Sequence, residues 1–490
     1  MPAAAQLKNA SLLRSQAHLD GQWCDALSGA TFPVMNPADA GTLATVPDMG
    51  PDDARLAVSA AHRAFPEWSR QTAGDRASTL RKWNDLILEN RQDLARLMTL
   101  EQGKPLKESL GEVDYGASFV AWFAEEARRA YGDVIPAHAS DKRILALRQP
   151  VGVCVAITPW NFPIAMITRK VAPALAAGCT VVVKPAAETP LCALALAWLA
   201  SEAGLPPGVF NVVTTDDASA VGEALLADIR VRKISFTGST PVGKILMRQA
   251  ADTVKRVSLE LGGNAPFIVF DDADVEAAAD GALASKYRNA GQTCVCANRI
   301  YVQDGIYDAF LAAYDKRVAG LKVGSGLDDG VDIGPIINEK GVGKIERLLD
   351  DAVRTGARIT RGGTRVSDDG TWFEPTIIQD VEDRMTISEE EIFGPVSAIY
   401  RFSDEEEAIR RANDTPFGLA AYFYSKDNAR IWRVSEALEY GMVGVNTGLV
   451  STAVAPFGGV KESGIGREGS RYGMDEYLEI KYVCVGGLSD

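Results

Sequence analysis

The stretch TVVVKPAAETPLCALALAWLASEAGLPPGVFNVV, residues 180–213, decides the fold class of this chain. It begins with an apolar, β-branched run at 180–185, continues with a helical segment at 189–204, and ends in a second apolar run at 209–213. Short apolar runs that alternate with helices are typical of βαβ units, whose parallel strands are covered on both faces. The stretch therefore predicts a parallel α/β sheet.

The same alternation extends to both sides of this stretch. Further strands are expected at 151–157, 231–238 and 256–263, and a second alternating region starts near residue 265 with PFIVF, a long helix DVEAAADGALASKYRNAG and the strand RIYVQ. The first 130 residues are expected to be mostly helical, because PDDARLAVSAAHRAFPEW opens with a Pro–Asp helix start and repeats apolar residues at helical spacing.

The length of 490 residues exceeds what one core supports, so two or more domains are expected. The alternation favours two α/β domains that meet near residue 260. DKRILALRQ at 141–149 and YLEIKYVCVGG at 477–487 are typical of exposed strands, which often add to the sheet of a partner.

The net charge of the chain is −14, from 51 Lys and Arg against 65 Asp and Glu. Such a chain repels a phosphate backbone, so nucleic acid is not expected as a partner. Small anions are also repelled at long range, and any anionic ligand must be held by a few local cations. No run reaches the ~18 apolar residues of a membrane helix, so no membrane partner is expected.

Seven cysteines are scattered through the chain, and only three histidines accompany them. An odd, scattered set is no disulfide framework and suits a reducing compartment, which predicts a cytoplasmic protein. Cys294 and Cys296 stand one residue apart in GQTCVCANR, but no second ligand cluster lies near them, so no metal site is expected.

The segment FTGSTPVGKI, residues 236–245, joins an expected strand to an expected helix. Glycines followed by a helix start at Pro241 are typical of a phosphate site, because free backbone N–H groups meet the positive end of the helix dipole there. A magnesium-binding P-loop is excluded, since Ile245 stands where Ser or Thr is required. A plain strand–helix turn remains the alternative.

Three further positions carry polar or reactive side chains that are candidates for a functional site. Asn161 in ITPWNFP ends a strand and either points its amide into a cleft or satisfies its own turn. Glu260 in VSLELGGNAP lies opposite apolar neighbours, and a solvated strand face is the favoured interpretation from the residues alone. Cys294 is either a nucleophile or, as most cysteines are, an inert buried thiol.

Together, in this order and spacing, these motifs resemble the aldehyde dehydrogenase superfamily over nearly the whole chain. The resemblance rests on PWNFP, KPAAETP, FTGS, LELGG, GQTC, EEIFGP and PFGGVKESGIGREG. Within the superfamily, ITRK, NAGQTCVCANR and NTGLVSTAVAPFGG are most similar to the succinate-semialdehyde dehydrogenase group, and glutarate-semialdehyde relatives share much of this pattern.

The resemblance implies oxidation of an aldehyde on a cysteine. Cys294 matches the nucleophile, whose thiolate attacks the carbonyl and yields a thiohemiacetal and then a thioester. Asn161 and the Cys294 backbone N–H match the oxyanion donors, and Glu260 matches the base that activates the hydrolytic water. Relatives that pass the acyl group to coenzyme A generally lack this Glu, so release of a free acid is expected.

The resemblance also implies a nicotinamide cofactor, with its contacts at Trp160, Lys184, Ala187, Gly238, Ser239, Glu391 and Phe393. Relatives that prefer NAD often carry Glu where Ala187 stands, as the acceptor for the 2′-hydroxyl. A small neutral residue there removes repulsion of a 2′-phosphate, which Lys184 pairs with, so NADP is expected to be preferred and NAD to remain possible. Glu188 reverses this preference if its side chain turns inward.

The substrate implied by the resemblance is an aldehyde with a terminal carboxylate, held by Arg169, Arg288 and Ser451. Succinate semialdehyde is expected, with glutarate semialdehyde or a broader ω-carboxy aldehyde as the alternative. Cys296 is not expected to be catalytic; it is either a reversible redox partner of Cys294 or a small loop filler.

The fold implied by the resemblance is two Rossmann-like open-sheet domains with a small β arm. Residues 1–130 and 151–260 are expected to form the cofactor-binding domain and 261–465 the catalytic domain. Residues 131–150 and 478–490 are expected to form an oligomerisation arm, which predicts a homodimer or homotetramer.

Overall fold

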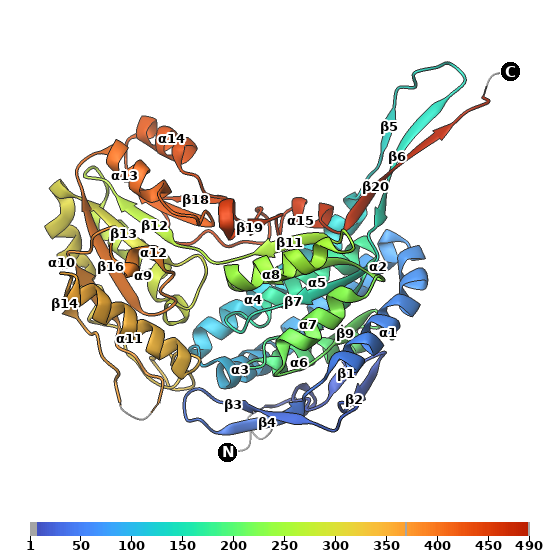
Figure 1. Ribbon diagram of the computed structural model, residues 1–490, viewed down its shortest axis with the longest axis horizontal. Helices are drawn as coiled ribbons and strands as arrows, with labels where there is room; N and C mark the ends of the chain where they lie inside the picture. The colour runs from blue at the N-terminus through green and yellow to red at the C-terminus, as the bar shows by residue number, and fades with distance from the viewer. Residues whose placement is uncertain (1–6, 368–369, 489–490) are drawn as a thin grey trace.

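The structure is a computed structural model that describes residues 7–367 and 370–488. Two large sheets, each covered by helices, lie side by side, and a narrow β arm extends away from the body (Figure 1). Within these described residues, no helix is both long and apolar enough to cross a membrane.

The first sheet has eight strands in the order β19-β11-β10-β7-β8-β9-β1-β2. Its members are β1 (Ala17–Leu19), β2 (Gln22–Cys24), β7 (Val153–Ile157), β8 (Thr180–Lys184), β9 (Phe210–Val212), β10 (Val231–Thr237), β11 (Arg256–Glu260) and β19 (Gly464–Ile465). The five central strands are parallel, which confirms the predicted α/β sheet. They are joined by α5 (Ala165–Ala177), α6 (Pro190–Glu202), α7 (Ala218–Ala227) and α8 (Thr240–Ala251).

The strand order of this sheet reverses at β7, whose neighbours are β8 on one side and β10 on the other. Loops at the carboxyl ends of such neighbouring strands diverge to opposite faces and leave a crevice between them. The loops that carry Asn161, after β7, and Gly238, after β10, therefore meet at the same edge of the sheet.

Four helices precede this sheet in the chain: α1 (Pro51–Arg70), α2 (Ala73–Glu89), α3 (Arg91–Gln102) and α4 (Leu106–Glu126). The expectation that the first 130 residues are mostly helical is wrong before Pro51, where β1 and β2 are followed by β3 (Thr31–Met35) and β4 (Thr42–Pro47). β1 and β2 have only three residues each and are too short for a periodic signal. β1 is completed by a distant partner, since His18 pairs with Val212 of β9.

The second sheet has seven strands in the order β14-β15-β16-β13-β12-β17-β18, parallel except for β14. Its strands are β12 (Ala265–Val269), β13 (Ala297–Gln303), β14 (Arg358–Arg361), β15 (Thr376–Gln379), β16 (Val396–Phe402), β17 (Ala420–Tyr424) and β18 (Met442–Val445). Its helices are α9 (Val275–Tyr287), α10 (Tyr307–Val318), α11 (Glu339–Arg354), α12 (Thr386–Glu389), α13 (Glu405–Asn413) and α14 (Asn428–Ala437).

The helix expected over DVEAAADGALASKYRNAG ends early, at Tyr287. Asn289 and Ala290 take left-handed backbone angles, with φ of 52° and 55°, which stop the helix and turn the chain. This turn brings Arg288 and the segment before Cys294 to the first sheet.

The arm is an antiparallel sheet of β5 (Asp133–Ile135), β6 (Arg143–Pro150) and β20 (Leu478–Val485), which follows the short helix α15 (Tyr472–Asp475). The two exposed strands expected in this part of the chain pair with each other. Val134 is 81% exposed and Ile480 is 72% exposed, so the arm presents apolar surface. Residues 1–6 and 489–490 of the expected domain ranges lie outside the described residues.

Candidate active site

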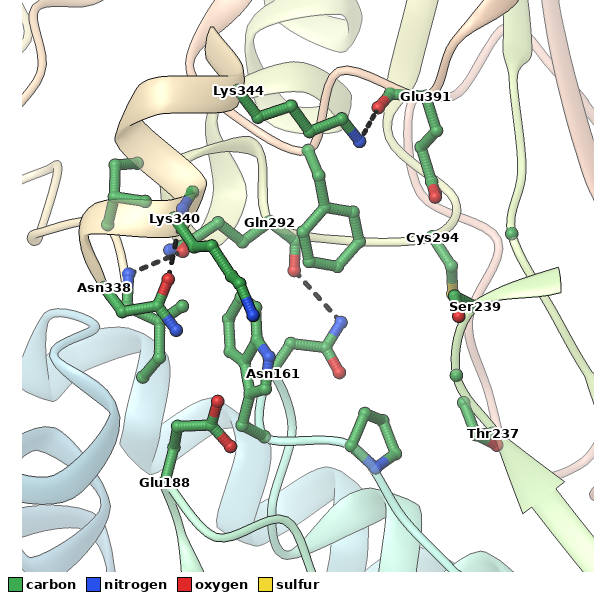
Figure 2. A pocket seen from close by; sticks show the side chains of 18 of the residues that line it. Asn161, Glu188, Thr237, Ser239, Gln292, Cys294, Asn338, Lys340, Lys344 and Glu391 are labelled. Carbon is green, nitrogen blue, oxygen red and sulfur yellow. Dashed lines mark hydrogen bonds between the residues drawn. The ribbon is translucent and has the colours of Figure 1, made fainter. Parts of the chain in front are cut away.

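A cavity of about 540 Å³ lies where the loops after β7, β10 and β11 meet the segment before β13. Seven of the residues expected at the site line it: Trp160, Asn161, Gly238, Ser239, Cys294, Glu391 and Phe393. Figure 2 shows Asn161 and Cys294 on the walls of this one cavity, although 133 positions separate them in the chain. The expected residues that do not line it are Lys184, Ala187, Glu260, Arg169, Arg288, Ser451 and Cys296.

Cys294 is partly buried, and its environment favours the protonated thiol. Burial raises its pKa to about 12, and Glu391 and Glu260 add to this rise, while Arg169 and Arg288 act against it. At neutral pH the thiol therefore keeps its proton until a base or added positive charge removes it.

Asn161 does not satisfy its own turn, which was the alternative for this side chain. Its Nδ2 donates a hydrogen bond of 3.0 Å to the backbone carbonyl of Gln292, two residues before Cys294. Its Oδ1 is buried and has no hydrogen-bond partner among the described residues. The side chain thus places an amide donor against the segment that carries the sulfur.

Glu260 ends β11 and is only 2% exposed, so the solvated strand face favoured from the sequence is wrong. The chain that leads into β19 covers this side chain at Gly458, and β19 itself pairs with the outer edge of β11, with Gly464 opposite Glu260. Neither carboxylate oxygen has a hydrogen-bond partner among the described residues. A Cβ on Gly458 would lie 3.0 Å from Oε1, so the carboxylate approaches this glycine rather than the cavity wall.

The pKa of Glu260 is raised well above the usual carboxyl range, chiefly by burial and then by Glu468. Arg169 and Lys170 act in the opposite direction. Glu468 forms ion pairs with both of these cations. Sequence reasoning did not single out Glu468, although it lies within the quoted motif PFGGVKESGIGREG.

The turn between β10 and α8 fits a phosphate group. Ser239 is the N-cap of α8 but makes no side-chain capping bond, and Pro241 stands in the first turn. A side chain at position 238 would have to displace the Phe236 ring, because a Cβ would lie 2.4 Å from it. Backbone amides at a helix N-terminus, open to a cavity and approached closely through a glycine, are the usual setting for a pyrophosphate.

Glu391, Phe393 and Trp160 also line the cavity. Trp160 and Phe393 meet edge to face with ring centroids 5.5 Å apart. Gly263 N–H donates to Glu391 Oε1 at 3.2 Å, and Lys344 Nζ donates to the Glu391 carbonyl at 2.5 Å. Burial raises the pKa of Glu391 to about 7. A carboxylate held beside the glycine pair 262–263 fits the hydroxyl groups of a ribose.

The KPAAETP segment lies beside this cavity with a different residue inward than expected. Lys184 is buried, donates from Nζ to the Pro185 carbonyl at 2.9 Å, and has its pKa lowered to about 8 by burial, against Glu188 and Asp216. Ala187 packs on the helical core, whereas Glu188 lines the cavity (Figure 2). Glu188 is thus the acidic group that faces a bound nucleotide.

Arg169 lies on α5, is 1% exposed and is paired with Glu468. Its guanidinium also lies over the Phe457 ring, 4.5 Å from the centroid. Nη2 is buried and has no hydrogen-bond partner among the described residues. The charge of the Arg169 guanidinium is therefore balanced by Glu468, and its Nη2 is left as a donor without a partner among the described residues.

Arg288 follows the end of α9 and lies over the Phe162 ring at 5.1 Å. Across residues 7–367 and 370–488 it makes no ion pair, so its charge is available to an anion. Tyr115 lies within electrostatic reach of both arginines, since Arg169 and Arg288 oppose the rise that burial causes in its pKa. Nothing in the sequence pointed to Tyr115. Ser451 is partly buried, between Val450 and Thr452, which line a second hollow.

Cys296 is buried and turned away from the cavity. Its Sγ–H donates to the Gly291 carbonyl at 3.4 Å, and Lys286 Nζ donates to Sγ at 3.6 Å. All seven cysteines are free thiols in this structure. A bond between Cys294 and Cys296 therefore requires Cys296 to leave both of these partners.

The fold and this cavity define a nucleotide-binding α/β protein with a cysteine at the edge of the nucleotide site. The aldehyde dehydrogenase family model matches residues 23–483, and the chain belongs to this family.

Two curated relatives match over nearly their full length. Succinate-semialdehyde dehydrogenase [NADP(+)] from Escherichia coli (strain K12) is 58% identical, covering 98% of this chain and 100% of the relative. A glutarate-semialdehyde dehydrogenase from Pseudomonas aeruginosa (strain PAO1) is 59% identical, covering 99% and 100%. The crystal structure of an E. coli NADP-dependent enzyme superposes with a TM-score of 0.97 at 58% identity, covering 98% of this chain and 100% of that one.

Proposed function

We propose that this chain oxidises succinate semialdehyde to succinate with NADP as the preferred oxidant and NAD as a weaker one. The observation that carries the proposal is Arg288, a guanidinium without an ion pair among the described residues, which lies against the residue next to Asn161. Such a group binds a carboxylate in bidentate fashion. The alternative, glutarate semialdehyde or another ω-carboxy aldehyde, is supported by the similarity to the Pseudomonas enzyme.

Acylation uses the two groups that face each other in the cavity. Cys294 Sγ releases its proton to solvent, and the thiolate attacks the aldehyde carbon; the C=O electron pair moves to oxygen and gives the oxyanion of a thiohemiacetal. Asn161 Nδ2 and the Cys294 N–H stabilise the oxyanion, and one such donor contributes about 3–4 kcal/mol. Arg288 and the free Nη2 of Arg169 hold the carboxylate at the other end of the substrate, with Ser451 beside them.

Deacylation uses Glu260. After hydride has left the thiohemiacetal, the thioester on Cys294 is attacked by a water whose proton passes to the Glu260 carboxylate. The raised pKa of Glu260 makes it a better base than a solvated carboxylate. Release of the acid returns the free thiol.

Bound NADP supplies the hydride acceptor. Gly238 and Ser239 would hold its pyrophosphate and Glu391 its nicotinamide ribose, and Phe393 and Trp160 would pack against the nicotinamide. Lys184 and the small Ala187, which stand next to Glu188 of the cavity wall, would accommodate a 2′-phosphate against the unfavourable charge of Glu188. The name of the E. coli relative supports the preference for NADP.

We also propose that the first sheet with residues 1–130 and 151–260 is the cofactor-binding domain, and that 261–465 is the catalytic domain. The arm at 131–150 and 478–490, with its exposed Val134 and Ile480, joins a second copy into a homodimer or homotetramer. Seven free cysteines support a reducing compartment, the cytoplasm.

The experiment is a panel of aldehydes with NADP and with NAD, followed by the rise of absorbance at 340 nm. Succinate semialdehyde is expected to give the highest kcat/KM, glutarate semialdehyde a lower one, and butanal, which lacks the carboxylate, one about 10- to 100-fold lower. Equal rates for butanal and succinate semialdehyde would exclude the carboxylate site. A strong preference for NAD would show that Glu188, not Ala187, decides the cofactor.

A further inference from the structure

One buried cation outside the cavity touches the loop that carries Asn161. Lys104 is 2% exposed, and its Nζ donates to the Asn161 backbone carbonyl at 2.7 Å and to Glu112 Oε2 at 2.5 Å. The same ammonium lies 4.0 Å from the centroid of the Phe162 ring. Burying a lysine this deeply costs free energy. Its ammonium contacts Asn161 and Phe162, two consecutive residues of the site.

Glu112, the partner of Lys104, binds the far end of the same loop. Its Oε1 accepts from Ile164 N–H at 2.9 Å and from Ala165 N–H at 3.3 Å, at the start of α5. The buried pair therefore fixes the backbone both at Asn161 and just after it. The loop cannot shift along its own direction without breaking a charge-assisted hydrogen bond.

A second set of contacts joins this loop to the segment before Cys294. Asn289 Nδ2 donates to the Asn161 carbonyl at 3.0 Å and to the Gln292 carbonyl at 3.3 Å. Gln102 orients that amide, because its Nε2 donates to Asn289 Oδ1 at 2.9 Å while its Oε1 accepts from Lys104 N–H at 3.0 Å. The Asn161 carbonyl thus receives two donors, and both lead back to the segment 102–104.

We propose that Lys104 is a positioning residue for the oxidation, which acts through Asn161 and holds its side-chain amide at the distance from Cys294 that the oxyanion requires. The inference rests on the proposed role of Asn161 in that reaction. Lys104 touches neither substrate nor sulfur. Its effect is therefore confined to the step in which Asn161 acts, and it disappears when the Asn161 amide is absent.

The test is a double-mutant cycle between position 161 and the Lys104–Glu112 pair. Lys104→Met is combined with Glu112→Gln, so that no carboxylate is left buried without a cation and an acceptor for Ile164 remains. In the parent, this paired variant is expected to lower the rate of the NADPH burst by about 10- to 100-fold, as a misplacement of about 1 Å does. On an Asn161→Ala background, the same change is expected to cost less than about 3-fold.

Further kinetic measurements and two control variants separate positioning from a general loss of structure. The KM values for aldehyde and cofactor are expected to stay within about 3-fold of the parent. In a single turnover with enzyme in excess over aldehyde, the variant is expected to form the same final amount of NADPH as the parent, only more slowly. Lys107→Met, which removes an exposed lysine paired with Asp332, is the matched control and leaves the burst rate as it is. Glu112→Gln alone keeps the Lys104 amine against Asn161 but leaves it without its carboxylate; it is expected to lower stability, and per folded enzyme to lose less of the burst rate than the paired variant.

Equal losses on the parent and Asn161→Ala backgrounds would overturn the proposal, because Lys104 would then act independently of Asn161. So would a loss from Glu112→Gln as large as that of the paired variant, since the cause would then be the start of α5. If the paired variant does not fold, Lys104→Gln, which keeps one donor, is taken through the same cycle. The assay uses whichever aldehyde the parent oxidises fastest, so an error in the proposed substrate does not affect the outcome.

Discussion

The two sides of Cys294 are built in opposite ways. On one side, the Asn161 carbonyl receives hydrogen bonds from Lys104 and Asn289, and the Asn161 amide is bonded to Gln292. On the other side, both carboxylate oxygens of Glu260 are buried without a hydrogen-bond partner in the described part of the chain. On the first side only Asn161 Oδ1 lacks a partner among the described residues and the backbone is fixed, whereas on the second side the whole carboxylate is left without one.

The difference corresponds to what each side has to do. An oxyanion donor is effective when it is already in place, because no reorganisation is then needed during the reaction. A general base has to exchange its proton with water and afterwards with solvent, so permanent partners would hinder it. Buried polar groups without partners are uncommon in native proteins, and they mark Glu260 as a group that acts on something else.

The largest effect is expected from a substitution that removes the base and keeps the shape of its side chain. Glu260→Gln is expected to lower kcat by about 10²- to 10⁴-fold, because hydrolysis of the thioester without a base then limits turnover. The first turnover needs no base on the water, so the NADPH burst should persist at one equivalent per active site. Rapid mixing at 340 nm measures both quantities. Loss of the burst itself would place Glu260 in acylation and remove the distinction between the two sides.

The two arginines extend this comparison to the substrate, since Arg288 lies over Phe162 on the fixed side while Arg169 is bound to Glu468 on the other. Arg288→Ala is expected to raise KM for succinate semialdehyde by about 10- to 100-fold and to leave KM for butanal within about 3-fold. Arg354→Ala removes an exposed arginine far along α11 and serves as the control. Equal losses for both aldehydes would show that Arg288 holds the fold rather than the carboxylate.

The pH dependence of kcat should come from the unsatisfied side. Burial and Glu468 raise the pKa of Glu260, while Arg169, Lys170 and Arg467 lower it, and the net direction is upward. A base with a raised pKa is protonated, and inactive, at low pH, so kcat is expected to rise about tenfold per pH unit until that pKa is passed. In Glu260→Gln, kcat should not change with pH over this range. If kcat of the variant still rises with pH, another group is responsible for the titration.

The fixed side was the more predictable of the two from the sequence. PWNFP and GQTC point to Asn161 and Cys294, and the apolar runs predict the parallel strands that bring them to one edge of the sheet. The environment of Glu260 was not predictable, because burial there depends on Gly458 and on β19, whose Gly464 pairs with Glu260 from 204 positions further along the chain. The ion pair of Arg169 with Glu468 has the same long-range origin. Short-range patterns do not encode such contacts.

The smallest expected effect concerns Cys296, which belongs to neither wall of the cavity. Its thiol is bonded to Gly291 and Lys286, and oxidation to a bond with Cys294 would have to break both contacts. Cys296→Ala is therefore expected to change kcat by less than about 3-fold under reducing conditions, since the sulfur touches no reacting group. Peroxide treatment of the parent, followed by a thiol reductant, decides whether the two cysteines form a switch. Recovery of activity in the parent but not in Cys296→Ala would show that the segment 291–296 rearranges on oxidation. The fixed side of the site would then be fixed only while Cys294 and Cys296 are reduced. Equal recovery, or none in either protein, would leave Cys296 as a packing residue and the comparison between the two sides as it stands.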